Sequence, residues 1–332
     1  MSERDVHEEP REALEGALFE IKRVIIGQDA MLERVMVALL TGGHVLLEGV
    51  PGLAKTLTIK TLASVVGGTF SRIQFTPDLV PSDLVGTRIY RPDSGRFDTE
   101  LGPVFANFLL ADEINRAPAK VQSALLEVMQ EQQVTIGGRT HMVPLPFLVL
   151  ATQNPIESEG TYPLPEAQVD RFLMKILVDY PSPGDEAAVV NRSLDPAAVV
   201  EERLSIADLL RFREAAAEVI VDREVIDYAV ALADATRRPG RYGLAEVEAL
   251  LSYGASPRGP IGLVQAARSL ALLRGRRHVL VSDVRDLAPE VLRHRLVLSY
   301  EGLSEGSRPD DLLEQIMSAV PEPDRNPEAV AA

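Results

Sequence analysis

The chain has no cysteine and no tryptophan, and only 5% of its 332 residues are aromatic. Without cysteine it cannot form a disulfide, use a thiolate nucleophile, or hold zinc or an iron–sulfur cluster through sulfur ligands. It also has no apolar run approaching the ~18 residues of a membrane-spanning helix, and its acidic N-terminus is unlike a secretory signal. These absences predict a protein of a reducing compartment, and we expect it to be cytoplasmic.

Negative charge is concentrated at the two ends of the chain. The formal net charge is -15, of which residues 1–20 and residues 299–332 together contribute -11, leaving -4 for the body. Acidic ends repel phosphate, which argues against broad binding to a nucleic-acid backbone. The nearly balanced body is still compatible with a local basic channel.

Short apolar runs alternate with helical patterns through the first half of the chain. The length predicts about two domains, and the contents of 46% hydrophobic and 25% charged residues are typical of a globular protein. The alternation predicts a mostly parallel five-stranded sheet covered by helices on both faces. The expected strands are 44–48, 70–75, 108–111, 147–151 and 174–178, and the expected helices include 31–40, 57–66 and 120–130.

Two hairpin patterns interrupt this alternation, one within residues 87–98 and one within residues 134–142, and we interpret both as insertions. After Pro181-Ser182-Pro183-Gly184 the patterns are helical, with no convincing strand up to residue 299. We therefore expect an acidic leader (1–20), an α/β core (21–180), a linker (181–184), a smaller all-α domain (185–299) and an acidic tail (300–332).

Residues 49–56, GVPGLAKT, match the phosphate-binding pattern G-x-x-x-x-G-K-[ST], except that Ala54 replaces the second glycine. A loop that leads into a helix offers backbone N–H groups and the positive end of the helix dipole to phosphate. Lys55 can reach the β- and γ-phosphates, and the Thr56 hydroxyl can bind Mg²⁺. We expect Ala54 to have an ordinary φ at the start of the helix. The alternative is a glycine turn before a surface helix.

Asp112 and Glu113 follow directly after the apolar run 108–111. In an open α/β sheet ligands bind at the carboxyl ends of the strands, so Asp112 should face the same crevice as the phosphate loop. There Asp112 can hold Mg²⁺ and Glu113 can orient and deprotonate a water molecule. The alternative is that both carboxylates merely cap the following turn.

Three segments occur in a specific order: GVPGLAKT, FLLADEINRAP and LATQNPIESEGTYPLPEAQVDRFLMKI. Together they resemble the MoxR family of AAA+ ATPases, and the similarity extends over residues 15–300. The resemblance implies an AAA+ P-loop core followed by a helical lid domain, with ATP and Mg²⁺ as ligands. The nucleotide contacts that we expect are Ile26, Gly27, Gly49, Val50, Pro51, Gly52, Leu53, Ala54, Lys55, Thr56, Leu57 and Asp112.

The same resemblance implies roles for three polar residues outside the loop. Asn154 corresponds to sensor 1, which helps to place the water beside Glu113, although an asparagine before proline is also typical of a turn. Arg171 corresponds to the arginine finger, which reaches the site of a neighbouring subunit and neutralises transition-state charge. The alternative for Arg171 is a solvated arginine at a helix end.

Arg258 corresponds to sensor 2, which contacts the γ-phosphate within its own subunit. We expect Ser256 to be the N-cap of a helix with Pro257 as its first residue. The alternative is an exposed arginine in a turn. Ile26 and Gly27 lie where AAA+ proteins receive adenine, but a core-edge isoleucine and a turn glycine give the same pattern.

An active site that takes an arginine from a neighbour requires a ring, which the resemblance implies to be a homo-hexamer. We expect an ATP-driven remodelling chaperone that matures protein clients or inserts metal into them, with a partner that carries a von Willebrand factor A domain. The alternatives are an AAA+ nucleic-acid motor or repair factor, and a scaffold that binds ATP with negligible turnover. Whether Arg116 acts across subunits, and whether the hairpins grip a client, stays open.

Overall fold

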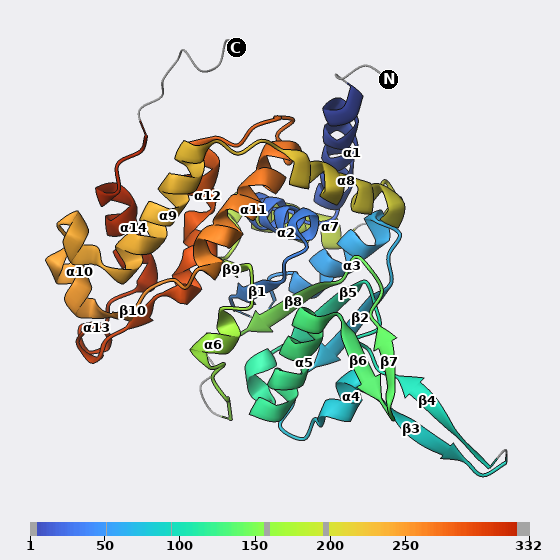
Figure 1. Cartoon of the computed structure of the whole chain (residues 1–332). Helices are drawn as coiled ribbons and strands as arrows, with labels where there is room; N and C mark the ends of the chain where they lie inside the picture. The colour runs from blue at the N-terminus through green and yellow to red at the C-terminus, as the bar shows by residue number, and fades with distance from the viewer. Residues whose placement is uncertain (1–4, 51, 94, 156–159, 195–198, 324–332) are drawn as a thin grey trace. The chain divides into compact units, whose positions relative to one another are not determined.

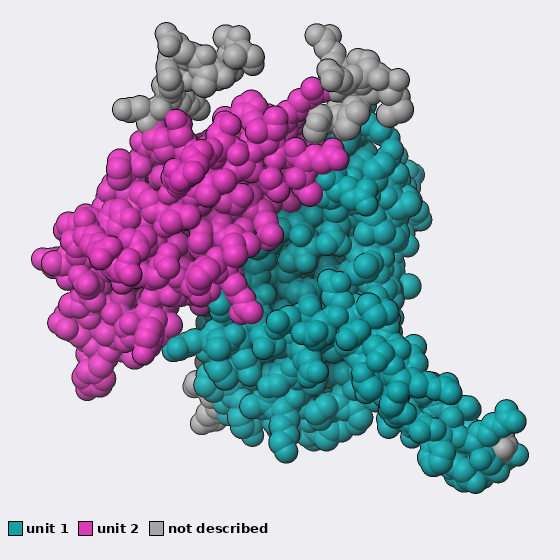
Figure 2. All heavy atoms as spheres, viewed as in Figure 1, with its two compact units in different colours: residues 1–215 teal, residues 216–332 magenta. Residues whose placement is uncertain are grey.

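The computed structural model describes residues 5–50, 52–93, 95–155, 160–194 and 199–323. The chain divides into two compact units, residues 1–215 (unit 1) and residues 216–332 (unit 2), which are coloured separately in Figure 2. Within the described ranges no helix combines the length and the apolar character needed to cross a membrane.

Unit 1 is built on a five-stranded parallel sheet, which confirms the expected fold class. Its spatial order is β2-β5-β8-β1-β9, so the chain runs from β1 to the edge strand β2, continues through the neighbouring β5 and β8, and then passes β1 to end at the opposite edge strand, β9. The strands are β1 (Val45–Glu48), β2 (Phe70–Gln74), β5 (Phe108–Asp112), β8 (Leu148–Gln153) and β9 (Met174–Leu177).

Helices cover both faces of this sheet, and α3 and α5 lie on opposite sides of it in Figure 1. The helices are α1 (Asp5–Lys22), α2 (Asp29–Thr41), α3 (Lys55–Val65), α4 (Pro81–Val85), α5 (Ala119–Glu131), α6 (Glu166–Val169), α7 (Pro183–Leu194) and α8 (Ile206–Glu218), with a 3-10 turn, η1 (Ile114–Arg116). The helix expected over residues 31–40 ends as predicted, because Gly42 adopts a φ of 76° and its N–H returns to carbonyls of the last turn.

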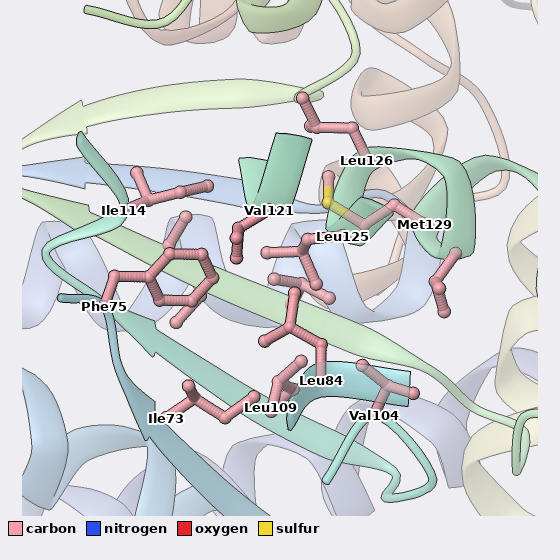
Figure 3. Packing of buried hydrophobic residues seen from close by; sticks show 14 of the residues in the cluster. Ile73, Phe75, Leu84, Val104, Leu109, Ile114, Val121, Leu125, Leu126 and Met129 are labelled. Atoms are coloured by element: carbon pink, nitrogen blue, oxygen red, sulfur yellow. The ribbon is translucent and has the colours of Figure 1, made fainter. Parts of the chain in front are cut away.

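The core of unit 1 lies between the sheet and α5, as Figure 3 shows. Leu109 and Ala111 of β5 point to this face and pack with Val121 and Leu125 of α5, and all four side chains are buried. Burial of one such leucine contributes about 1.5–3 kcal/mol. The strand is therefore held rigidly by apolar contacts, and its polar end, Asp112, has a fixed position.

Two antiparallel hairpins extend from this core, and both sequence predictions are confirmed. They consist of β3 (Gly86–Arg91) with β4 (Arg96–Leu101), and of β6 (Gln133–Ile136) with β7 (Arg139–Met142). The β3–β4 hairpin projects from the body of unit 1 (Figures 1 and 2). Where the hairpins meet, the Arg88 side chain lies so close to Gly137 that a Cβ atom there would collide with it. A side chain at that position would require Arg88 to shift, and Gly137 also has a φ of 56°, so the contact favours glycine.

Unit 2 is largely helical. Its elements are α9 (Arg223–Arg237), η2 (Pro239–Tyr242), α10 (Ala245–Leu250), β10 (Leu251–Tyr253), α11 (Arg258–Leu273), α12 (Val281–Leu292), η3 (Arg293–Arg295), β11 (Val297–Leu298), α13 (Tyr300–Ser304) and α14 (Pro309–Ala319). The expectation that residues 185–299 contain no strand was wrong, because β10 and β11 pair in an antiparallel ladder. With three and two residues, they are too short to give a periodic pattern.

The helix that carries Arg258 begins one residue later than expected. Pro257 is the N-cap of α11 and Arg258 its first residue, so the prediction of Pro257 at the first helical position was wrong. The Ser256 hydroxyl still accepts a hydrogen bond from the Arg258 N–H at 3.2 Å. Ser256, which was predicted to be the N-cap, therefore binds the first N–H group of α11 from the position before the N-cap.

Both chain ends and the expected linker carry more structure than their composition suggests. In α1 the side chains of Leu14 and Ile21 are buried, and in α14 those of Leu312 and Ile316. In both helices the apolar residues recur at helical spacing between acidic ones. Each helix therefore packs through one apolar face, while its acidic side chains stay in solvent. The helix α7 begins at Pro183, within the expected linker 181–184, and the two compact units divide at residues 215/216 instead.

His44, directly before β1, is a buried and neutral histidine. Its Nδ1 accepts the Val149 N–H at 3.1 Å, and its Nε2 lies 3.1 Å from the Met129 carbonyl oxygen, to which it donates. Burial lowers the pKa of His44 to about 4. Protonation would place an N–H at Nδ1 against the Val149 N–H, two donors facing each other.

We predict that His44 makes the folded protein sensitive to acid. An unfolded histidine has a pKa of about 6.5, so between pH 6.5 and 4 the unfolded chain binds more protons, and the stabilisation is lost as pH falls. From about pH 7.5 to about pH 5 this costs about 2 kcal/mol of unfolding free energy. The comparison is with His44→Gln, whose amide can keep both hydrogen bonds. Between these two pH values the unfolding free energy of the wild type, measured by urea denaturation, should fall by this amount relative to that of His44→Gln. Identical pH dependence would contradict the assignment.

Candidate active site

A cavity of about 460 Å³ opens where the carboxyl ends of β1, β5 and β8 meet. It brings together the phosphate loop, the carboxylates after β5 and the amide after β8, as expected for an open α/β sheet. The residues that line it are Gly49, Gly52, Leu53, Ala54, Lys55, Thr56, Leu57, Arg72, Gln74, Asp112, Glu113, Thr152, Gln153 and Asn154.

The loop between β1 and α3 forms one wall of this cavity. The Gly49 N–H donates to the Gln153 carbonyl at 3.3 Å, which ties the loop to the end of β8. Lys55, the first residue of α3, turns back and donates from Nζ to the Gly49 carbonyl oxygen. Val50 does not contribute to the described lining, and Pro51 lies outside the described residues.

The expectation of an ordinary φ at Ala54 was wrong. Ala54 has φ 54° and ψ 17°, the left-handed conformation, and it is the N-cap of α3. The loop must reverse direction within a few residues before the helix starts, and a left-handed residue provides that reversal. For a residue with a Cβ atom this conformation costs about 1–2 kcal/mol.

Lys55 is the cation at the centre of the loop. Its ammonium is half-buried, and this burial lowers its pKa, while the negative charges of Asp112, Glu113 and Glu48 act in the opposite direction. The three carboxylates therefore favour the ammonium form in a place that water only partly reaches. Such a cation is available to a phosphate that enters the cavity.

The carboxylate of Asp112 is held by two neighbouring strands. Its Oδ1 accepts the Thr152 hydroxyl of β8 at 2.6 Å, and its Oδ2 forms an ion pair with Arg72 Nη2 of β2, also at 2.6 Å. The Thr152 oxygen in turn accepts the Glu113 N–H at 2.9 Å. The hydroxyl thus fixes both acidic residues relative to β8.

Glu113 is aimed into the cavity by a second set of contacts. It has φ 56°, a left-handed conformation that is uncommon for a side chain of this kind. Its Oε2 accepts Gln74 Nε2 at 2.7 Å and pairs with Arg116 Nε at 2.9 Å. Backbone strain of this kind is typical of functional sites, where the surrounding contacts maintain it.

Comparisons with known proteins show the family to which this chain belongs. A family model described as "ATPase family associated with various cellular activities (AAA)" matches residues 44–174, and one described as "AAA lid domain" matches residues 244–316. The protein named "Chaperone MoxR1" from Mycobacterium tuberculosis is 58% identical over 94% of this chain and 83% of its own length. The chain belongs to the MoxR family of AAA+ ATPases.

A second relative and a solved structure also span most of this chain. "Protein MoxR" from Methylorubrum extorquens is 33% identical and covers 92% of this chain and 93% of its own. A crystal structure of a candidate ATPase from Cytophaga hutchinsonii superposes with a TM-score of 0.91 at 46% identity, covering 96% of this chain and 98% of that one. This MoxR-family protein is accordingly an ATP-hydrolysing enzyme, and it binds nucleotide.

The residues expected to act in this MoxR-family site are distributed over several places. Asn154 lines the cavity and is buried, close to the end of β8. Arg171 is exposed and lines a different cavity of about 410 Å³ beside α5, where its Nη1 donates to the Leu126 carbonyl at 3.2 Å. Arg258 begins α11 in unit 2. Ile26 and Gly27 precede α2 and are not among the described lining residues.

The sequence analysis missed four residues that line the cavity: Arg72, Gln74, Thr152 and Gln153. Arg72 and Gln74 are two positions apart in β2, so their side chains project from the same side of the strand. Polar residues at this spacing, at the end of a strand expected to be buried, were a usable signal. Thr152 gave no such signal, because threonine is common in strands of any kind.

We predict that Ala54→Gly stabilises the protein. Glycine removes the cost of the left-handed conformation but adds entropy to the unfolded chain, and the balance is about 0.5–1 kcal/mol in favour of folding. Urea denaturation at neutral pH measures it. The control Ala187→Gly, at an exposed position inside α7, should destabilise by about 1 kcal/mol. If both variants are destabilised equally, the conformation assigned to Ala54 is contradicted.

Proposed function

We propose that the chain is a Mg²⁺-dependent, ring-forming chaperone ATPase that remodels partner proteins. The observation that supports the chemistry is the single cavity in which Lys55, Thr56, Asp112, Glu113 and Asn154 converge. The chaperone role is supported by the relative named "Chaperone MoxR1", which matches this chain over most of its length.

Each of these side chains has a distinct task in the proposed reaction. Lys55 binds the β- and γ-phosphates through its ammonium. Thr56 and Asp112 offer oxygen atoms only, the donor type that Mg²⁺ prefers, so the residues present fit that ion. Mg²⁺ bound there would neutralise phosphate charge. Glu113 accepts a proton from the attacking water, and Asn154 orients that water.

The proposed ring rests on the position of Arg171. Its side chain is exposed and lines the cavity beside α5 instead of the one that holds Lys55. An arginine finger in that position acts on the site of a neighbouring copy, and repetition of such a head-to-tail contact closes a ring. We propose a homo-hexamer, with Arg258 reporting the nucleotide state from the lid.

The proposed clients are proteins that the ring matures or into which it inserts metal, together with a partner that carries a von Willebrand factor A domain. The β3–β4 hairpin is suited to contact a client, since Tyr90 and Phe97 are more than half exposed and their ring centroids lie 5.2 Å apart. Arg88 lies over the Phe97 ring at 4.9 Å. An aromatic pair beside a cation is a common contact surface for protein segments.

The division of roles predicts different defects for two variants. Lys55→Ala should weaken ATP binding about ten- to a hundredfold, because a charge-assisted contact to phosphate is lost. Glu113→Gln should retain binding and lower turnover at least about a hundredfold, since the proton acceptor is lost. Fluorescent-nucleotide titration and steady-state phosphate release measure the two effects. Equal loss of binding in both variants would contradict the assignment.

The ring predicts complementation between two inactive variants. When Lys55→Ala and Arg171→Ala subunits are mixed in equal amounts, about one interface in four receives both an intact loop and an intact finger. Phosphate release should recover to about that fraction of the wild-type rate. The matched control mixes Lys55→Ala with the double variant, which cannot form a complete site. No recovery in rings shown to be mixed would contradict a finger that acts in trans.

A further inference from the structure

Arg72 has no role in the reaction described so far, yet it makes a close contact to the proposed metal-binding carboxylate. It lies on β2, the edge strand next to β5, and its guanidinium lines the nucleotide cavity. Nη2 lies 2.6 Å from Asp112 Oδ2 and 3.1 Å from Gln74 Oε1. The guanidinium is therefore the cation adjacent to Asp112.

The two oxygens of Asp112 are bound in different ways. Oδ1 accepts the neutral Thr152 hydroxyl, which is itself fixed by the Glu113 N–H. Oδ2 is paired with the positive charge of Arg72. A divalent cation that approaches Asp112 is compatible with the hydroxyl but repels the guanidinium. Arg72 is therefore the partner that must move.

The exposure of Arg72 allows this movement. Its side chain is 48% exposed, whereas the Asp112 side chain is 18% exposed. A pair that solvent reaches this easily is worth little, corresponding to about a two- to fivefold change in an equilibrium constant. The ion pair can therefore neutralise Asp112 in the absence of metal without preventing a divalent ion from displacing it.

We propose that Arg72 is a positioning residue that acts as a replaceable counter-ion: it neutralises Asp112 while no divalent cation is bound, and withdraws when one binds. This inference rests on the proposed Mg²⁺-dependent nucleotide site and adds a residue to it. Without Arg72, Asp112 has lost its ion-pair partner and repels the incoming phosphates more strongly unless metal is present. Nucleotide binding then becomes more dependent on metal.

The test compares the wild type with Arg72→Gln in equilibrium titrations with the fluorescent nucleotide mant-ATP, once in EDTA and once in Mg²⁺. The ratio of the dissociation constant in EDTA to that in Mg²⁺ should rise about two- to fivefold in Arg72→Gln. Arg72→Lys, which keeps the charge, should return the ratio toward the wild-type value. Arg223→Gln, which removes the exposed Arg223–Asp227 pair on α9, should leave it unchanged.

A second readout needs no nucleotide. Mn²⁺ titration followed by electron paramagnetic resonance should show about two- to fivefold tighter binding to Arg72→Gln than to the wild type, because the competing cation is gone. A residue that merely supports the fold would lower both affinities together. Thermal unfolding checks that each variant is folded.

The outcomes separate this inference from the proposed function. An unchanged ratio, or equal weakening in EDTA and in Mg²⁺, overturns the role of Arg72. If the wild type itself fails to bind mant-ATP under both conditions, the proposed function fails, and the Mn²⁺ titration alone decides whether Arg72 competes for Asp112. Tighter Mn²⁺ binding by Arg72→Gln supports the competition, and unchanged or weaker binding overturns it.

Discussion

The site depends on one constraint, the common direction of neighbouring strands in a parallel sheet. Hydrogen bonding aligns Glu48 with Gln153 and Gln74 with Asp112, and the same parallel register makes all five strands end at one edge of the sheet. The strands β1, β5 and β8 are buried by apolar contacts up to that edge, whereas β2 carries the exposed side chains of Arg72 and Gln74. Residues that lie far apart in sequence therefore meet at one cavity without any flexible segment to position them.

Charge at this edge is balanced within the protein before any ligand arrives. Asp112 is paired with Arg72, Glu113 with Arg116, and Glu48 with Lys175 at 2.7 Å. Carboxylates gathered at one edge would otherwise repel one another. The ion pairs offset this repulsion and orient the carboxylates, and because most of the paired side chains are partly exposed, each pair is weak. Breaking one of these ion pairs therefore requires little free energy, so a charged ligand can replace the arginine or lysine partner of a carboxylate.

Much of this arrangement could be predicted from the sequence because its signals are local. Apolar runs marked the five strands, and the glycine-containing loop between strand and helix marked the site at Lys55. The fixed order of three segments identified the family. The two hairpins followed from turn residues between alternating patterns.

The rest depends on non-local geometry. The φ of Ala54 is set by how the loop must turn between β1 and α3, which no pattern encodes. Arg72 and Thr152 became part of the site only through the register of β2 and β8 with β5. At the chain ends, the acidic composition drew attention away from apolar residues at helical spacing, such as Leu14 in α1 and Leu312 in α14, which are buried.

The contact between Arg88 and Gly137 has a mechanical consequence. It joins two hairpins that leave the fold at different points, one in the connection from β2 to β5 and the other in the connection from α5 to β8. In the sheet, β2 and β8 are the two neighbours of β5, the strand that ends at Asp112. A pull on the projecting tip is therefore carried along the chain to β2 and β5 and, through the contact between Arg88 and Gly137, to the segment that leads into β8, so that force applied to this hairpin reaches the strands around Asp112 by more than one route.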